Sequence, residues 1–88
     1  MLAEVLFKLK SYKMTQEELI NLIIEEHDNS LKPEDISEDF LQQIDSIDAM
    51  LIAVSIEREL RYNVDLDGID ITKATVTELL NFINEQQS

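Results

Sequence analysis

The sequence predicts an all-α protein, a single small helical bundle, and three observations lead to this prediction. Its 88 residues leave room for one core at most. One Gly and one Pro supply little material for tight hairpin turns, whereas 44% of the residues are hydrophobic, as in an ordinary globular chain. Two capping boxes, each a Thr followed three residues later by a Glu, mark the beginnings of helices.

The N-terminal segment, residues 1–13, has a character of its own. Its apolar residues fall on one helical face, and it carries three lysines against one glutamate. It has neither the Arg-rich composition of a transit peptide nor the long apolar centre of a signal peptide. We therefore expect residues 1–13 to be an N-terminal extension or an extra amphipathic helix, and residues 14–88 to form the domain of a cytoplasmic protein.

The first helix of the domain is predicted to begin after Thr15. The capping box Thr15-Gln16-Glu17-Glu18 precedes a helical apolar pattern that ends near His27. Residues 30–45 then show no sustained period, and so long a connection in so small a domain is usually functional. We expect its apolar residues to plug the core: Ile36, Phe40, Leu41 and Ile44.

The second helix is predicted to run from Ser46 to about Leu60. Ser46 is expected to be its N-cap, with Asp48 complementing the helix dipole. A helical wheel gives one apolar arc that can close a bundle, formed by Ala49, Ile52, Ala53, Ile56 and Leu60. It gives a second apolar arc, formed by Ile47, Met50, Leu51 and Val54. This second arc is left for a neighbouring segment, a ligand or a partner.

Two short elements complete the prediction. Residues 61–70 form a turn region with at most one helical turn, and Thr75-Val76-Thr77-Glu78 is a capping box that opens the last helix. That helix places Val76, Leu79, Leu80 and Ile83 on one face.

Charge and composition exclude several classes of function. The net charge of −12 repels nucleic acid and anionic lipid and attracts basic protein surfaces, although acidity can also simply keep a small domain soluble. The absence of Cys excludes disulfides and thiolate metal sites. His27 is the only histidine, so the usual nucleophile–base pairs of hydrolases cannot be assembled. The longest apolar run, Ala49–Val54, is far too short to span a membrane.

A partial calcium-binding motif lies in the turn region. Asn63, Asp65, Asp67 and Gly68 match positions 1, 3, 5 and 6 of a calcium loop. The match then fails, because position 12, which should be a bidentate Glu, is Ala74. We expect weak divalent association with an acidic surface rather than a specific metal site.

The stretch "IDSIDAM", followed by an apolar helix that ends in Glu57-Arg58-Glu59-Leu60, resembles the acyl carrier proteins. The hallmark of that family is Asp-Ser-Leu-Asp, or a near relative, at the start of the second helix. The resemblance extends from about Thr15 to Phe82. It includes the first helix, the long connection, the D-S-x-D signature, the acidic turn and the Thr75-capped last helix.

This resemblance implies a small four-helix bundle of acyl-carrier type, with a long loop between helices one and two and a short helix three. It implies that Ser46 receives 4′-phosphopantetheine from coenzyme A through a phosphopantetheinyl transferase, and that the arm's thiol carries an acyl group as a thioester. A helix N-terminus suits the phosphate, because its free amides and dipole favour negative charge. Residues 14–88 would then be an acyl carrier domain, which is not itself an enzyme.

The surfaces around Ser46 follow from the same interpretation. We expect partner contacts from Asp45, Asp48, Leu51, Glu57 and Arg58. We expect the arm and the acyl group to lie along Ile47, Met50, Val54, Val64 and Ile71. The expected partners are the transferase and acyl-transferring, condensing or acyl-activating enzymes with basic docking patches. Nucleic-acid binding and a membrane span are not expected, and the protein should be a monomer.

The chain departs from the family's pattern in two ways. Gln42-Gln43-Ile44 stands where a glycine usually comes shortly before the D-S pair. Fatty-acid carriers commonly have Glu five residues after the serine and an acidic pair eleven and twelve after it, but here these positions hold Leu51, Glu57 and Arg58. The partner face is less acidic and more apolar, which suggests a specialised fatty-acid or polyketide-like pathway.

A second hypothesis belongs to another class of function. The chain could be an unmodified acidic helical adaptor whose second apolar arc binds a partner helix. The mass of the protein after exposure to a broad-specificity transferase would separate the two hypotheses.

Overall fold

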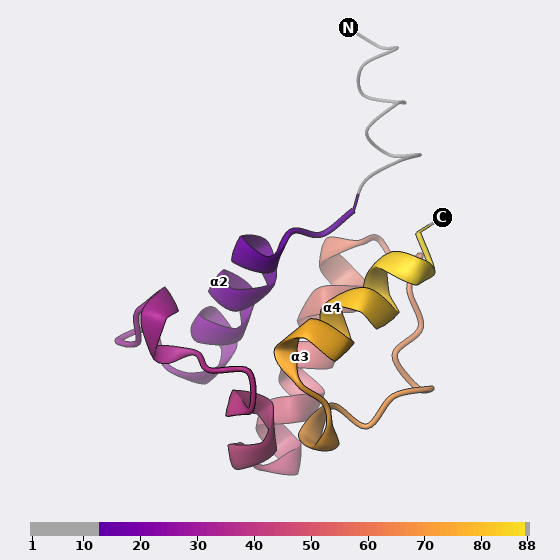
Figure 1. The fold of residues 1–88 in the computed structure, drawn as a ribbon. Coiled ribbons are helices and arrows are strands. Elements are labelled where there is room, and N and C mark those ends of the chain that lie inside the picture. Colours follow the sequence, from indigo (N-terminus) through magenta and orange to yellow (C-terminus); the bar gives the residue numbers. More distant parts are fainter. Residues whose placement is uncertain (1–12, 88) are drawn as a thin grey trace, which may run out of the picture.

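The computed structural model describes residues 13–87, and Figure 1 shows them as packed helices. The three α-helices are α2 (Gln16–His27), α3 (Ser46–Glu59) and α4 (Val76–Glu85). Three short 3₁₀ helices join them: η1 (Pro33–Asp35), η2 (Phe40–Gln43) and η3 (Ile71–Lys73). No strand occurs within residues 13–87, so the all-α prediction is confirmed for this part of the chain.

Within residues 13–87, the number of α-helices is smaller than predicted. Between α3 and α4 the structure has the single 3₁₀ turn η3 where a short third helix was expected. Residues 1–12 of the predicted N-terminal extension lie outside the described residues. Within residues 13–87, no helix is both long enough and apolar enough to cross a membrane.

Both predicted capping boxes are confirmed. The Thr15 hydroxyl accepts a hydrogen bond from the Glu18 amide at 3.1 Å, and the Glu18 carboxylate accepts one from the Thr15 amide at 2.8 Å. Thr75 and Glu78 form the same reciprocal pair at 3.0 and 2.9 Å. These bonds satisfy amides that have no acceptor within the helix, and so fix where α2 and α4 begin.

The predicted cap of α3 was wrong. Asp45, with extended backbone, is the N-cap, and its carboxylate accepts a hydrogen bond from the Asp48 amide at 2.8 Å. Ser46 is instead the first helical residue. Asp and Ser are comparable caps, but a carboxylate also gains from the positive end of the helix dipole, which favours Asp45. The Ser46 side chain is therefore not used for capping.

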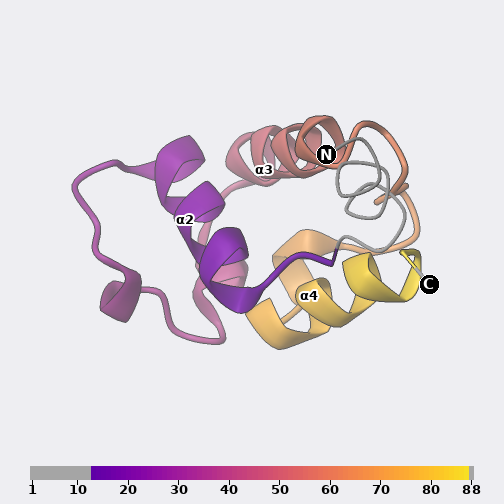
Figure 2. The ribbon, with the colours of Figure 1, turned by 90° about the horizontal axis from the view of Figure 1, so that it is seen from above.

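The core lies between the three α-helices and the connection that joins α2 to α3. Figure 2 shows this connection swinging out beyond α2 before it returns to the base of α3. Its apolar residues Ile36, Leu41 and Ile44 are buried, while Phe40 is half-buried against the core. The prediction that the connection plugs the core is confirmed. The fully buried side chains include Leu19, Ile23, Leu41, Ile52, Ile56, Leu79 and Ile83.

The two ends of the described chain are joined. The Met14 amide donates to the Asn84 side-chain oxygen at 2.9 Å, and the Asn84 side-chain amide donates back to the Met14 carbonyl at 2.9 Å. Met14 is 2% exposed. These bonds fix the entry of the chain into α2 beside the last turns of α4.

Glu38 fastens the long connection to the start of α4. Its carboxylate accepts hydrogen bonds from the Thr77 hydroxyl at 2.6 Å and the Thr77 amide at 2.9 Å, and its carbonyl accepts one from the Val76 amide at 3.0 Å. The Thr77 hydroxyl and then the Thr77 amide lower the pKa of the Glu38 carboxyl below its usual value of 4.5. The ionised carboxylate is therefore the form that the folded chain favours.

This bonding predicts a pH-dependent effect of Glu38→Gln. A carboxyl whose pKa is depressed by folding stabilises the protein above its ordinary pKa, and the stabilisation is lost as the pH falls through the lower folded value. The variant should unfold at a lower urea concentration than the wild type at pH 7, and the difference should shrink below about pH 4.5. Glu34→Gln, in the same connection, is the control. A difference in the urea midpoint between the variant and the wild type that is absent at pH 7, or that stays constant on acidification, would contradict this role.

Candidate functional site

The Ser46 hydroxyl is the chemically available group at the start of α3. Ser46 is exposed, and within residues 13–87 its hydroxyl has no hydrogen-bond partner. Two other serines are occupied: Ser30 donates to the Asp28 carboxylate at 2.7 Å, and Ser37 donates to the Asp39 carboxylate at 2.6 Å. Ser55 is half-buried. Ser46 is thus the serine with the freest hydroxyl in the described part of the chain.

An open groove of about 560 Å³ begins at Ser46 and runs between α3 and the 66–72 segment. One wall comes from α3 and the other from the loop that leads into η3. The lining residues are Ser46, Ala49, Met50, Ala53, Leu66, Asp67, Gly68, Ile69, Asp70, Ile71 and Thr72. Most of these side chains are apolar or small, and the two carboxylates stand on the loop side. The groove can accept a flexible chain that is attached at Ser46.

The structure separates the residues that were expected to border the arm and the acyl group. Met50 and Ile71 line the groove. Ile47 and Val54 lie outside it, with 63% and 42% of their surface exposed, and Val64 is buried at 4%. Of the residues expected to border the arm and the acyl group, only Met50 and Ile71 therefore lie in the groove.

Sequence reasoning missed the small residues that make room for the groove. Ala49 and Ala53 are one helical turn apart on α3, and their short side chains leave space beside Ser46. Gly68 lies on the opposite wall, where an added Cβ would stand 3.2 Å from the Phe82 ring. The i, i+4 pair of alanines was a signal in the sequence, whereas the approach of Gly68 to Phe82 depends on the tertiary fold.

The second apolar arc of α3 is exposed. Ile47, Met50, Leu51 and Val54 expose 63%, 59%, 43% and 42% of their surface, and they form a strip that we call the α3 strip. Within residues 13–87, no segment buries it. Contiguous apolar residues on a surface commonly mark an interaction site.

The three acids that were expected to contact partners also have hydrogen bonds within the chain. Asp45 caps α3, and Asp48 contacts the His27 ring at 2.8 Å. The Glu57 carboxylate accepts a hydrogen bond from the Leu66 amide at 3.3 Å, which holds the loop wall of the groove to α3. Each acid therefore helps to shape the surroundings of Ser46, and contact with a partner remains a prediction.

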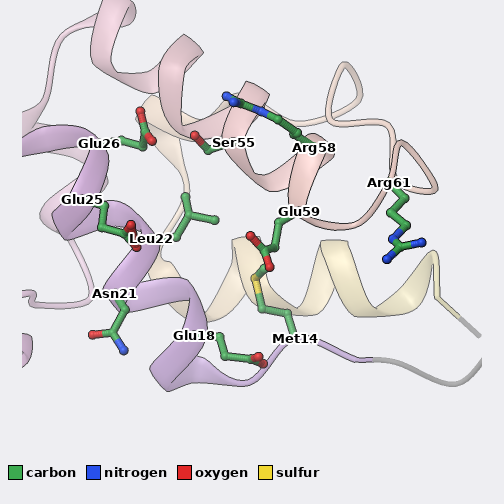
Figure 3. A pocket seen from close by; sticks show the side chains of 10 residues that line it. All are labelled: Met14, Glu18, Asn21, Leu22, Glu25, Glu26, Ser55, Arg58, Glu59 and Arg61. Atoms are coloured by element: carbon green, nitrogen blue, oxygen red, sulfur yellow. The ribbon is translucent and has the colours of Figure 1, made fainter. Parts of the chain in front are cut away.

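The remaining partner residue, Arg58, borders a second and more polar cavity. This cleft of about 500 Å³ lies between α2 and α3. Figure 3 shows its lining: Met14, Glu18, Asn21, Leu22, Glu25, Glu26, Ser55, Arg58, Glu59 and Arg61. Ser55 and Glu59 point away from the Ser46 side of α3, as expected at 100° per residue. The cleft and the groove therefore flank opposite sides of α3.

The acidic turn that resembled part of a calcium loop uses its side chains to hold its own backbone. Asp65 accepts a hydrogen bond from the Asp67 amide at 2.9 Å. Asp70 accepts bonds from the Thr72 hydroxyl at 2.7 Å and the Thr72 amide at 3.1 Å, and the hydroxyl bond is the larger cause of the lowered pKa of its carboxyl. Within the described residues, no three His, Asp or Glu side chains are grouped to hold a metal ion.

Comparisons with family models, with curated proteins and with solved structures give no match to this chain.

Proposed function

We propose that this chain is an acyl carrier protein, in which Ser46 bears 4′-phosphopantetheine and the arm's thiol holds acyl groups as thioesters. One observation carries the proposal: an exposed, unpaired hydroxyl on the first residue of α3 stands at the mouth of a largely apolar groove. The D-S-x-D frame around it, Asp45 to Asp48, supports the same conclusion from the sequence. A carrier of this kind is not itself an enzyme.

The local geometry suits attachment of a phosphate. The Ser46 oxygen would attack the phosphorus that bears the pantetheine in coenzyme A. A phosphorus–oxygen ester bond forms, the pyrophosphate bond breaks, and adenosine 3′,5′-bisphosphate leaves, while the hydroxyl proton passes to a base of the transferase. In the product, the phosphate lies at the N-terminus of α3, where the dipole and the first-turn amides favour negative charge. The Asp45 carboxylate accepts the hydrogen bond of the Asp48 amide. The amides of Ser46 and Ile47 are then the free amides nearest to the phosphate.

The groove gives the arm and its cargo a place to lie. Met50 and Ile71 would contact the arm, and Ala49 and Ala53 would leave space for the acyl group. In this proposal, the 3₁₀ turn η3 stands where a four-helix carrier bundle would have its short third helix. Glu57 supports the shape of the groove, because its carboxylate accepts a hydrogen bond from the Leu66 amide and so holds the loop wall against α3.

The charge and the α3 strip support partners with basic docking surfaces. The transferase and the acyl-transferring, condensing or acyl-activating enzymes would present basic patches to Asp45, Asp48 and Glu57, and we place the protein in the cytoplasm as a monomer. Leu51 and Arg58 replace two acids expected of a fatty-acid carrier. We therefore assign it to a specialised fatty-acid or polyketide-like pathway.

The exposed α3 strip also supports a second candidate, an unmodified adaptor that binds a partner helix. Incubation with coenzyme A and a broad-specificity phosphopantetheinyl transferase separates the two. We expect the intact mass to rise by one phosphopantetheine group. If the protein stays unmodified while a known carrier in the same tube is loaded, the adaptor is the better account.

The specialised pathway predicts that Leu51→Glu with Arg58→Glu makes the loaded protein a better substrate for general fatty-acid-synthase enzymes. The wild type would lack one ion pair at Leu51 and would place Arg58 against the like charge of a basic patch. Acyl elongation by a standard enzyme set is the measurement. Gln16→Glu with Lys32→Glu changes the net charge equally at exposed positions on other elements, and should leave elongation unchanged. Equal elongation of the wild type and a housekeeping carrier would contradict the specialised pathway.

A further inference from the structure

His27 contacts the serine-bearing turn from a different helix. Its ring Nδ1 lies 2.8 Å from the Asp48 carboxylate, and both side chains are 29% exposed. Within residues 13–87, this is the only contact of salt-bridge length between a basic side chain and a carboxylate, and it is an ion pair when His27 is protonated. A pair that is shielded to this extent is screened less by water and salt than one on the open surface.

The surroundings of His27 hold its ring in place. His27 is the last residue of α2, where the helix dipole favours a cationic side chain. Its ring meets the Phe40 ring edge-on, with centroids 5.3 Å apart and planes at 84°. The His27 side chain therefore connects three elements at one point, namely α2, η2 and α3.

Asp48 is held through both its backbone amide and its carboxylate. Its amide donates to the Asp45 carboxylate at 2.8 Å, and one of its own carboxylate oxygens, Oδ2, faces His27. Within residues 13–87, its other oxygen, Oδ1, has no hydrogen-bond partner. His27 thereby fixes the direction of that free oxygen, two residues from Ser46.

We propose that His27 is a positioning residue for the loading of Ser46. It orients the Asp48 carboxylate so that the free oxygen meets a basic group of the docking transferase. This inference rests on the proposed carrier function. It goes beyond that function by assigning the protein's only histidine, which takes no part in bond making or breaking.

The test is steady-state loading by a broad-specificity transferase, with the carrier as the varied substrate. His27→Ala should raise the KM for the carrier about two- to fivefold, the range of a partly exposed ion pair, and leave kcat nearly unchanged. His27→Gln keeps a side-chain N–H donor and should restore most of the loss. The double variant His27→Ala/Asp48→Asn should be no worse than Asp48→Asn alone, because His27 acts through Asp48.

A purely structural role for His27 gives a different pattern. Thr75→Ala removes the cap of α4, a different helix from the one that bears Ser46, and should lower the melting temperature without raising the KM. If His27→Ala behaves like Thr75→Ala, or if its effect adds fully to that of Asp48→Asn, the positioning role is overturned. These comparisons apply when the transferase loads the wild type. A wild type that stays unmodified overturns the carrier function, and the role of His27 with it.

Discussion

Ser46→Ala is expected to abolish loading completely while leaving the fold intact. The substitution removes the oxygen that forms the ester bond, so no slower route through the same site remains. Asp45, not Ser46, caps α3, and the Ser46 hydroxyl has no partner within residues 13–87. The free energy of unfolding should therefore change by about 0.5 kcal/mol or less. Intact mass reports loading, and urea unfolding reports stability.

Thr15→Ala provides the opposite pattern as a control. It removes the cap of α2 and should cost about 1 kcal/mol of stability, yet the attachment oxygen and the acids beside it remain. Ser55→Ala, on the other side of α3, should be loaded like the wild type. If Ser46→Ala still gained one arm, Ser46 would not be the attachment point. If it unfolded, the structural argument that its hydroxyl is free would be wrong.

Leu41→Ala is expected to have the largest effect on stability. Leu41 is completely buried although it lies in the long connection, and its element η2 packs against η3, which lines the groove. Truncation leaves a cavity beneath η2 and η3. We therefore expect the free energy of unfolding to fall by about 3 kcal/mol, which is a large part of the stability of a small domain. Urea unfolding of the loaded and unloaded protein measures it.

Leu51→Ala is the matched control for this substitution. It removes the same atoms from a leucine that is 43% exposed on the α3 strip, and should cost about 0.5 kcal/mol or less. Similar losses for Leu41→Ala and Leu51→Ala would show that the connection is not part of the core.

Local patterns in the sequence predicted most of the helical fold. The two Thr–Glu capping boxes located the starts of α2 and α4, since each box depends only on residues three apart. The burial of Ile36, Leu41 and Ile44 followed from their apolar side chains in an otherwise polar connection. The cap of α3 was misassigned because Asp45 and Ser46 are both good caps, and only the backbone conformation decides between them.

The features around Ser46 that the sequence could not predict depend on contacts between distant residues. His27 and Asp48 are 21 residues apart, and no periodicity joins a helix end to the first turn of another helix. The loop wall of the groove rests on the bond from the Leu66 amide to Glu57 and on the approach of Gly68 to Phe82. Val64 looked like a groove residue in the sequence, but the turn directs it into the core instead.

Peptide mapping of the loaded wild type tests the central claim most directly. After incubation with coenzyme A and the transferase, the protein is digested and each modified peptide is fragmented to locate the phosphopantetheine. We expect one arm per chain, attached to Ser46. An arm on Ser30, Ser37 or Ser55, whose hydroxyls are bonded or half-buried, or a chain that carries no arm at all, would contradict it.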